Sequence, residues 1–109
     1  MWVHCIYDPD RATSNYHHRG MAADLHIADE HPIDQFLIAT RFHFGGIGVY
    51  GPDVWHNPGI HVDLRPQFPA ARWARRAVGH EYLYVPLDTV YLIDLVRMVE
   101  NETTKVFIN

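Results

Sequence analysis

The chain has 109 residues, of which 48% are hydrophobic and 20% are charged, and its net charge at pH 7 is −4. These values predict one small globular domain over residues 1–109 and exclude a disordered chain. The acidic balance argues against nucleic-acid binding, and no apolar run is long enough to span a membrane. Cys5 is the single cysteine, which excludes an internal disulfide.

The first third of the chain predicts two strands. Residues 2–7 are rich in β-forming types and end at a turn over residues 8–10. A polar loop is expected over residues 11–21, followed by a second strand over 22–27. Because side chains alternate along a strand, Asp24 and His26 are expected on the same face of that second strand.

The middle of the chain predicts one helix between strands. Pro32 suits the first position of a helix, and apolar residues up to Phe44 recur at roughly helical spacing before Gly45 and Gly46 end it. Short strands are expected over 46–50 and 60–65. Residues 60–65 alternate strictly, so His61 and Asp63 are expected to share one face.

The C-terminal part predicts a short helix over 72–77, a strand over 81–85, a long helix from residue 86 or 88 to about 100, and a short strand over 105–108. The class predicted by this order is α+β: a single small domain with a mainly antiparallel sheet and helices packed on one face.

A metal site is predicted from the two strands that carry carboxylates and histidines. Histidine and carboxylate side chains are usual ligands of zinc, and a catalytic zinc takes three protein ligands and keeps one open position. If the strands over 22–27 and 60–65 are antiparallel neighbours, their polar faces converge. We therefore predict one Zn²⁺ held by His17, Asp24 and His61.

A hydrolytic site also needs a general base and a donor for the oxyanion. Asp63 is the first candidate for the base, with His56 and His26 as alternatives. Arg11 or Arg19 is the candidate for binding a substrate carboxylate or the oxyanion. A closed, non-catalytic site, with His26 or Asp63 as a fourth ligand, is the alternative.

These residues resemble the zinc D-Ala-D-Ala carboxypeptidase and L-alanyl-D-glutamate endolysin family, which shares its fold with lysostaphin-type peptidases and the hedgehog domain. The family pattern Ser-x-His-x-x-Gly-x-Ala-x-Asp is matched from His17 to Asp24, with Asn15 in place of the serine. A second pattern is matched by Gly46-Ile47-Gly48-Val49-Tyr50 and His61-Val62-Asp63-Leu64-Arg65, and Arg72-Trp73 resembles its usual ending. The resemblance covers roughly residues 2–73.

The resemblance implies a metallopeptidase that hydrolyses amide bonds in peptidoglycan stem peptides. Two departures support the alternative of an inactive zinc-binding or peptidoglycan-binding module. Asn15 stands in place of the family's serine, and the family's Gly-Tyr-Arg strand end is Ile6-Tyr7-Asp8 here. Pro58 stands where many relatives carry the acid that serves as the base, so the resemblance leaves the base open. The start of the chain lacks the basic and apolar regions of a signal peptide, which suits a phage product that stays in the cytoplasm until lysis and then acts on the cell wall.

Overall fold

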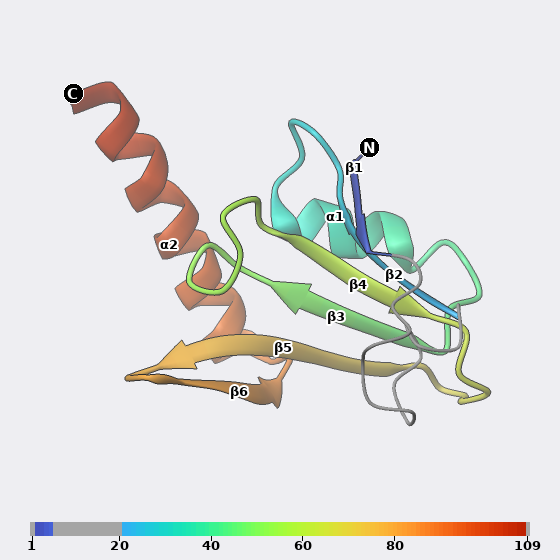
Figure 1. Ribbon diagram of the computed structural model, residues 1–109. Coiled ribbons are helices and arrows are strands. Elements are labelled where there is room, and N and C mark those ends of the chain that lie inside the picture. Colours follow the sequence, from blue (N-terminus) through green and yellow to red (C-terminus); the bar gives the residue numbers. More distant parts are fainter. Residues whose placement is uncertain (1, 6–20, 109) are drawn as a thin grey trace.

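The fold is that of a computed structural model, which describes the backbone of residues 2–5 and 21–108 and the side chains of residues 21–101. Six strands form one sheet in the spatial order β1-β2-β4-β3-β5-β6 (Figure 1). Their bounds are β1 Trp2–Cys5, β2 Ala22–His26, β3 Gly46–Tyr50, β4 Gly59–Asp63, β5 Ala71–Val78 and β6 Glu81–Pro86. Only β3 and β5 pair in parallel, and the other four pairings are antiparallel.

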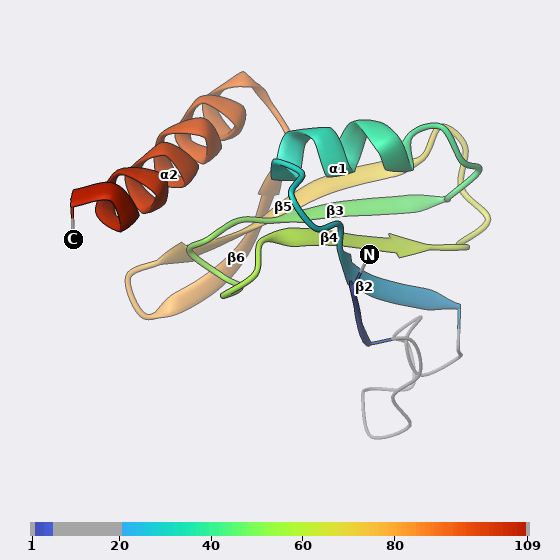
Figure 2. The same ribbon diagram turned by 90° about the horizontal axis from the view of Figure 1, so that it is seen from above.

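Two helices lie on the same face of this sheet (Figure 2). Helix α1 spans Pro32–Ala39 and packs on β3 and β4, and helix α2 spans Thr89–Ile108. Pro32 suits the start of α1 because it has no N–H to leave unsatisfied there. The side chain of His31 caps the helix by accepting the Ile33 N–H at 3.1 Å. No helix in the described part of the chain is long and apolar enough to cross a membrane.

The apolar core fills the space between the sheet and the helices. Strand residues that point to the helix face supply most of it, since alternate side chains of β3 and β4 are apolar. The buried residues form two clusters, one of Ala39, Ile47, Ile60 and Val62 under α1, and one of Val49, Ala74, Tyr91 and Leu95 under α2. All the polar positions of the candidate site therefore point to the opposite face of the sheet.

The predicted α+β class, the mainly antiparallel sheet and the placement of both helices on one face are confirmed. Two predicted elements were wrong. The segment 72–77 is not a helix but the middle of β5, because it pairs on both sides, in parallel with β3 and in a hairpin with β6. The segment 105–108 is not a strand but the last turn of α2, since the helix continues through the β-forming residues there.

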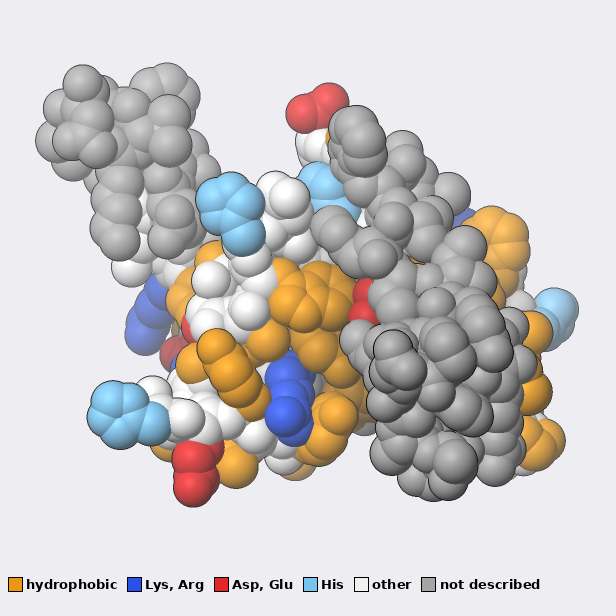
Figure 3. Space-filling view, in the orientation of Figure 1, with side chains coloured by type: hydrophobic (Ala, Val, Ile, Leu, Met, Phe, Trp, Pro, Cys, Tyr) orange, Lys and Arg blue, Asp and Glu red, His pale blue; other side chains and the backbone are white. Residues whose placement is uncertain are grey.

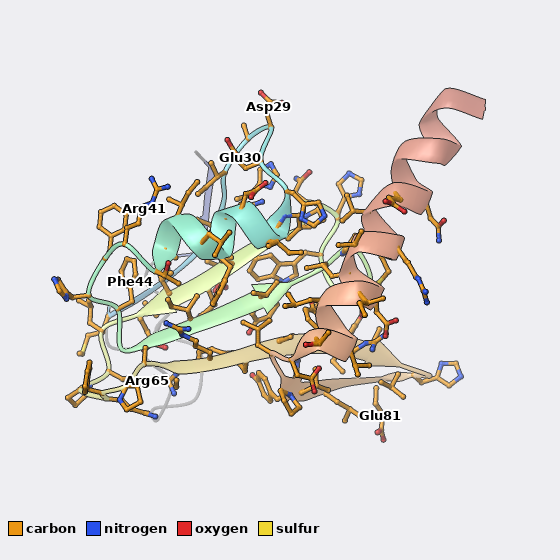
Figure 4. The ribbon with its side chains drawn as sticks, turned by 180° about the vertical axis from the view of Figure 1, so that it is seen from behind. Asp29, Glu30, Arg41, Phe44, Arg65 and Glu81 are labelled. Atoms are coloured by element: carbon orange, nitrogen blue, oxygen red, sulfur yellow. The ribbon has the colours of Figure 1, made fainter. Side chains whose placement is uncertain are left out.

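The end of the first helix also differs from the prediction. Helix α1 stops at Ala39, and the cap residue Thr40 donates its backbone N–H to Phe36 O at 3.1 Å. Phe44, which was predicted on the helix, lies in the connection between α1 and β3 (Figure 4). Its side chain still packs against the core cluster under α1, which explains why its spacing resembled a helical pattern.

Candidate metal centre

Two of the three predicted ligands lie side by side on neighbouring strands. Strands β2 and β4 are antiparallel, and their register pairs Asp24 directly with His61. The distance from His61 Nδ1 to Asp24 Oδ1 is 3.0 Å. Both residues are buried, with 6% and 8% of Asp24 and His61 exposed. The pair therefore offers one oxygen and one nitrogen donor at a shared point on the face that the helices do not cover.

Asp63 lies behind His61, on the side of the imidazole away from Asp24. Its Oδ2 accepts the His61 Nε2–H at 2.8 Å. Arg65 donates to both carboxylate oxygens, from Nε to Oδ1 at 2.8 Å and from Nη2 to Oδ2 at 2.7 Å. Only 1% of Asp63 is exposed. Burial alone would raise the pKa of Asp63, but the hydrogen bonds from His61 and Arg65 hold it well below its usual value.

The two carboxylates control the protonation of His61. Burial alone would lower the pKa of the imidazole, but the hydrogen bonds to Asp24 and Asp63 and the charges of both carboxylates raise it overall. The bond to Asp63 keeps a proton on Nε2 and fixes the ring orientation. A metal at Asp24 would therefore meet Nδ1, and it would replace the proton that this nitrogen otherwise carries. A carboxylate behind a ligand histidine is the usual support of a metal site.

The glycines of β3 make room for the side chains of this face. A Cβ on Gly48 would lie 2.5 Å from the indole Nε1 of Trp73, and a Cβ on Gly46 would lie 2.5 Å from both carboxylate oxygens of Asp63. The Trp73 ring centroid lies 5.3 Å from that of His61, and the guanidinium carbon of Arg65 lies 4.9 Å from the Trp73 ring centroid. Gly46 and Gly48 thus leave space over β3 for the side chains of Asp63 and Trp73, which come from the strands on either side of it.

Aromatic residues continue this face beyond the metal pair. Tyr50 lies two residues along β3 from Gly48, and its ring stacks on Trp55 with centroids 4.3 Å apart. Burial raises the pKa of the Tyr50 phenol to about 12, so the hydroxyl stays protonated and able to donate a hydrogen bond. Trp55 therefore packs against Tyr50 at the end of β3.

The structure places His26 and His56 away from the Asp24–His61 pair. Both line a cavity of about 500 Å³ at the end of the sheet, together with residues of the β2–α1 connection such as Asp29 and Glu30 (Figure 4). His26 Nδ1 hydrogen-bonds Pro58 O at 2.9 Å. No hydrogen bond joins His56 to Asp24 or His61 in the described part of the chain. Neither Asp24 nor His61, the two predicted ligands, lines this cavity.

The remaining predicted residues, His17, Arg11 and Arg19, lie outside the described residues. Within residues 2–5 and 21–108, no group of three or more His, Cys, Asp and Glu side chains is arranged to hold a metal. The donor chemistry of Asp24 and His61 nevertheless fits zinc, since it leaves positions for a third ligand and for substrate. Asp63 does not suit the role of a fourth ligand, because Arg65 and His61 already occupy its oxygens.

Comparison with protein-family models, with curated proteins and with solved structures found no match for this chain.

Sequence reasoning did not identify two supporting residues. Arg65 was expected on the polar face of its strand. Alternation does not specify, however, that its guanidinium hydrogen-bonds the carboxylate of Asp63, two residues earlier. Gln35 is fully buried, accepts the Ile27 N–H and donates to Glu30 O and Pro58 O. A glutamine inside an otherwise apolar helix stripe is the signal that could have identified it.

Proposed function

We propose that the chain is a zinc-dependent peptidase that hydrolyses amide bonds in peptidoglycan stem peptides, with the hedgehog and D-Ala-D-Ala-peptidase type of fold. The observation that carries the proposal is the Asp24–His61 pair, with the two donor atoms 3.0 Å apart and the imidazole held from behind by Asp63. Two buried acidic residues, Asp24 and Asp63, flank one imidazole. Burial of such groups is costly unless each is paired, and titratable groups arranged in this way are often part of a functional site.

Asp24 and His61 would hold the metal, with His17 as the third ligand. A zinc ion bound there would polarise the amide carbonyl and lower the pKa of a water molecule in its open position. The work of the chain is to hold the ligands in the correct geometry. Asp63 keeps the proton on Nε2 and directs the lone pair of Nδ1 toward the metal, and Arg65 holds Asp63 in place.

This assignment changes the role that we give to Asp63. As a general base it would need an oxygen facing water near the scissile carbonyl. Both of its oxygens are engaged by His61 and Arg65, and the low pKa of the carboxyl makes it a poor proton acceptor. We therefore propose that Asp63 orients His61, and that the proton of the attacking water is accepted elsewhere.

The same observation favours the second candidate function. If the site has no base, the chain would bind zinc and peptidoglycan peptides without cleaving them. His56, the alternative base, makes no hydrogen bond to the metal pair within the described residues. The inactive binding module of the same fold is therefore the alternative, by analogy of fold alone.

Turnover separates the two functions. Purified stem peptides and peptidoglycan fragments would be incubated with zinc-loaded protein, and the products would be identified by mass spectrometry. The peptidase proposal predicts new amine and carboxylate ends that disappear in the Asp24→Ala and His61→Ala variants. The His80→Ala variant, which changes an exposed histidine between β5 and β6, is the matched control and should remain active. Binding of fragments without any new ends would favour the inactive module.

A further inference from the structure

The candidate metal pair occupies one row of a larger face, and a second row lies beside it. The strand registers align Asp24, His61, Gly48 and Trp73 across β2, β4, β3 and β5. Two residues along, Tyr50 on β3, Arg75 on β5 and Tyr84 on β6 are aligned in the same way. Figure 3 shows a basic side chain among hydrophobic ones on this face, over β5 and β6.

Arg75 is held in place but is not neutralised. Its guanidinium carbon lies 4.0 Å from the ring centroid of Tyr84, whose own surface is 67% exposed. No carboxylate in the described part of the chain pairs with Arg75, whereas Arg65 binds Asp63 and Arg76 binds Asp94. A guanidinium that rests on an aromatic ring keeps its planar donor edges free for a ligand.

The position of Arg75 relative to the metal pair follows from the registers. β5 is separated from β4 by one strand, and Arg75 is two residues along from Trp73, which lies in the row of His61. With about 4.8 Å between strands and about 3.4 Å per residue, the backbones of Arg75 and His61 lie roughly 12 Å apart. About three or four residues of extended peptide span that distance.

We propose that Arg75, supported by Tyr84 and flanked by Tyr50, binds a carboxylate group of the peptide substrate at a distance of several residues from the scissile amide. The proposal rests on the proposed function for the position of that amide. An arginine fork matches a carboxylate with two parallel hydrogen bonds, which gives both affinity and orientation. If the bound carboxylate is the C-terminal one, its distance from the metal pair makes cleavage internal to the peptide, rather than release of its last residue.

The test compares a stem peptide acid with the same peptide amidated at its C-terminal carboxylate or at its side-chain carboxylate. The kcat/KM for the fully acidic peptide should exceed that for one of the two amides by about tenfold or more, mainly because the KM of the acidic peptide is lower. The amide that loses this advantage identifies the carboxylate that binds. Arg75→Gln should abolish the preference, Arg75→Lys should retain part of it, and kcat should change little.

Arg72→Gln is the matched control, because Arg72 lies on the same strand but points to the helix face, with its guanidinium carbon 5.5 Å from the Phe36 ring centroid. This variant should keep the full preference. Equal use of acid and amides by the wild type, or an unchanged preference in Arg75→Gln, would overturn the proposal and leave the peptidase intact.

Calorimetric binding of the same peptides to protein without zinc keeps the two proposals separate. If no peptide is cleaved but the acid binds more tightly, and Arg75→Gln removes that difference, the peptidase proposal fails and the carboxylate subsite stands. If the acid and both amides bind equally, or none binds, the subsite proposal fails.

Discussion

The two faces of the sheet obey different physical rules, although the same strands build both. On the helix face, Ile47, Ile60 and Val62 pack against the apolar side chains of Phe36 and Ala39 on α1. On the other face, Asp24, His61 and Asp63 are almost as deeply buried, but every one of them is charged or titratable. Neighbouring residues of one strand therefore lie on different faces, one stabilised by apolar packing and the other by charge interactions.

This contrast shows that the two faces contribute differently to the free energy of folding. Burial of apolar surface on the helix face stabilises the fold whatever the pH. The buried charges on the opposite face stabilise it only while each has its partner, because an unpaired buried charge is costly. Such a network is a poor way to gain stability, which is why we connect it with a site.

The largest effect is expected from Asp63→Ala in zinc-free protein. The change removes the carboxylate that Arg65 binds and the acceptor of the His61 Nε2–H, and it should cost about 4 kcal/mol of unfolding free energy at pH 7. The folded-state pKa of Asp63 lies below its unfolded value, so its contribution is present above about pH 4 and is lost as the pH falls further. Urea unfolding at pH 7 and pH 3 measures both.

Asp34→Ala is the control for this prediction, since Asp34 is an exposed acid in the first turn of α1. It should cost less than about 1 kcal/mol at pH 7. A loss for Asp63→Ala that stays the same from pH 7 to pH 3 would contradict the charge-based account of this face.

On the helix face, Ile47→Ala should cost about 3 kcal/mol, because Ile47 is 1% exposed and its truncation leaves a cavity under α1. The four buried residues of that cluster are apolar, so the loss should be the same at pH 7 and pH 3. The exposed Ile93 gives the control, and Ile93→Ala should change the stability by less than about 0.5 kcal/mol. A pH-dependent loss for Ile47→Ala would break the contrast between the two faces.

A smaller effect is expected within the row of the open face that contains Asp24 and His61. Gly48→Ala should cost about 2 kcal/mol, because its new Cβ would displace the Trp73 indole. A double-mutant cycle with Trp73→Ala tests the reason, since the cost of Gly48→Ala should largely vanish once the indole is absent. Equal costs in both backgrounds would show that the strain arises elsewhere.

The smallest effect is expected at Tyr91, a buried residue of α2 on the helix face. Its hydroxyl has no hydrogen-bond partner among the described residues, so Tyr91→Phe should change the stability at pH 7 by less than about 1 kcal/mol. Burial, and secondarily the charge of Asp53, raise its pKa above the unfolded value of about 10. The stability it contributes is present below that pH and lost above it, so the variant should lose less stability than the wild type above pH 10.

The candidate site could be predicted from the sequence because strand alternation is a strong rule. Residues 60–65 alternate strictly between apolar and polar types, and this pattern predicts that His61 and Asp63 share a face without specifying which strands lie beside them. Strand partners are not specified by alternation, and the helix predicted over 72–77 shows the consequence. Ala and Arg favour helices locally, but pairing with β3 and β6 outweighs that preference and brings Trp73 and Arg75 to the open face.

The supporting contacts could not be predicted for a related reason. Two contacts illustrate this: the hydrogen bonds from Arg65 to Asp63, and the space that Gly48 leaves for Trp73. They depend on atoms from three strands at distances of a few ångströms. Sequence spacing gives the face of a residue but not the neighbour across the sheet. For this reason we propose that Asp63 orients His61, whereas the sequence predicted it as the general base.

The most direct test of the central claim is the zinc content of the purified protein, measured by elemental analysis beside the Asp24→Ala, His61→Ala and His80→Ala variants. The account predicts about one zinc per chain in the wild type and in His80→Ala, and a loss of that zinc in the other two. A wild type that stays free of zinc after incubation with the metal would contradict it. So would equal zinc contents in all four proteins.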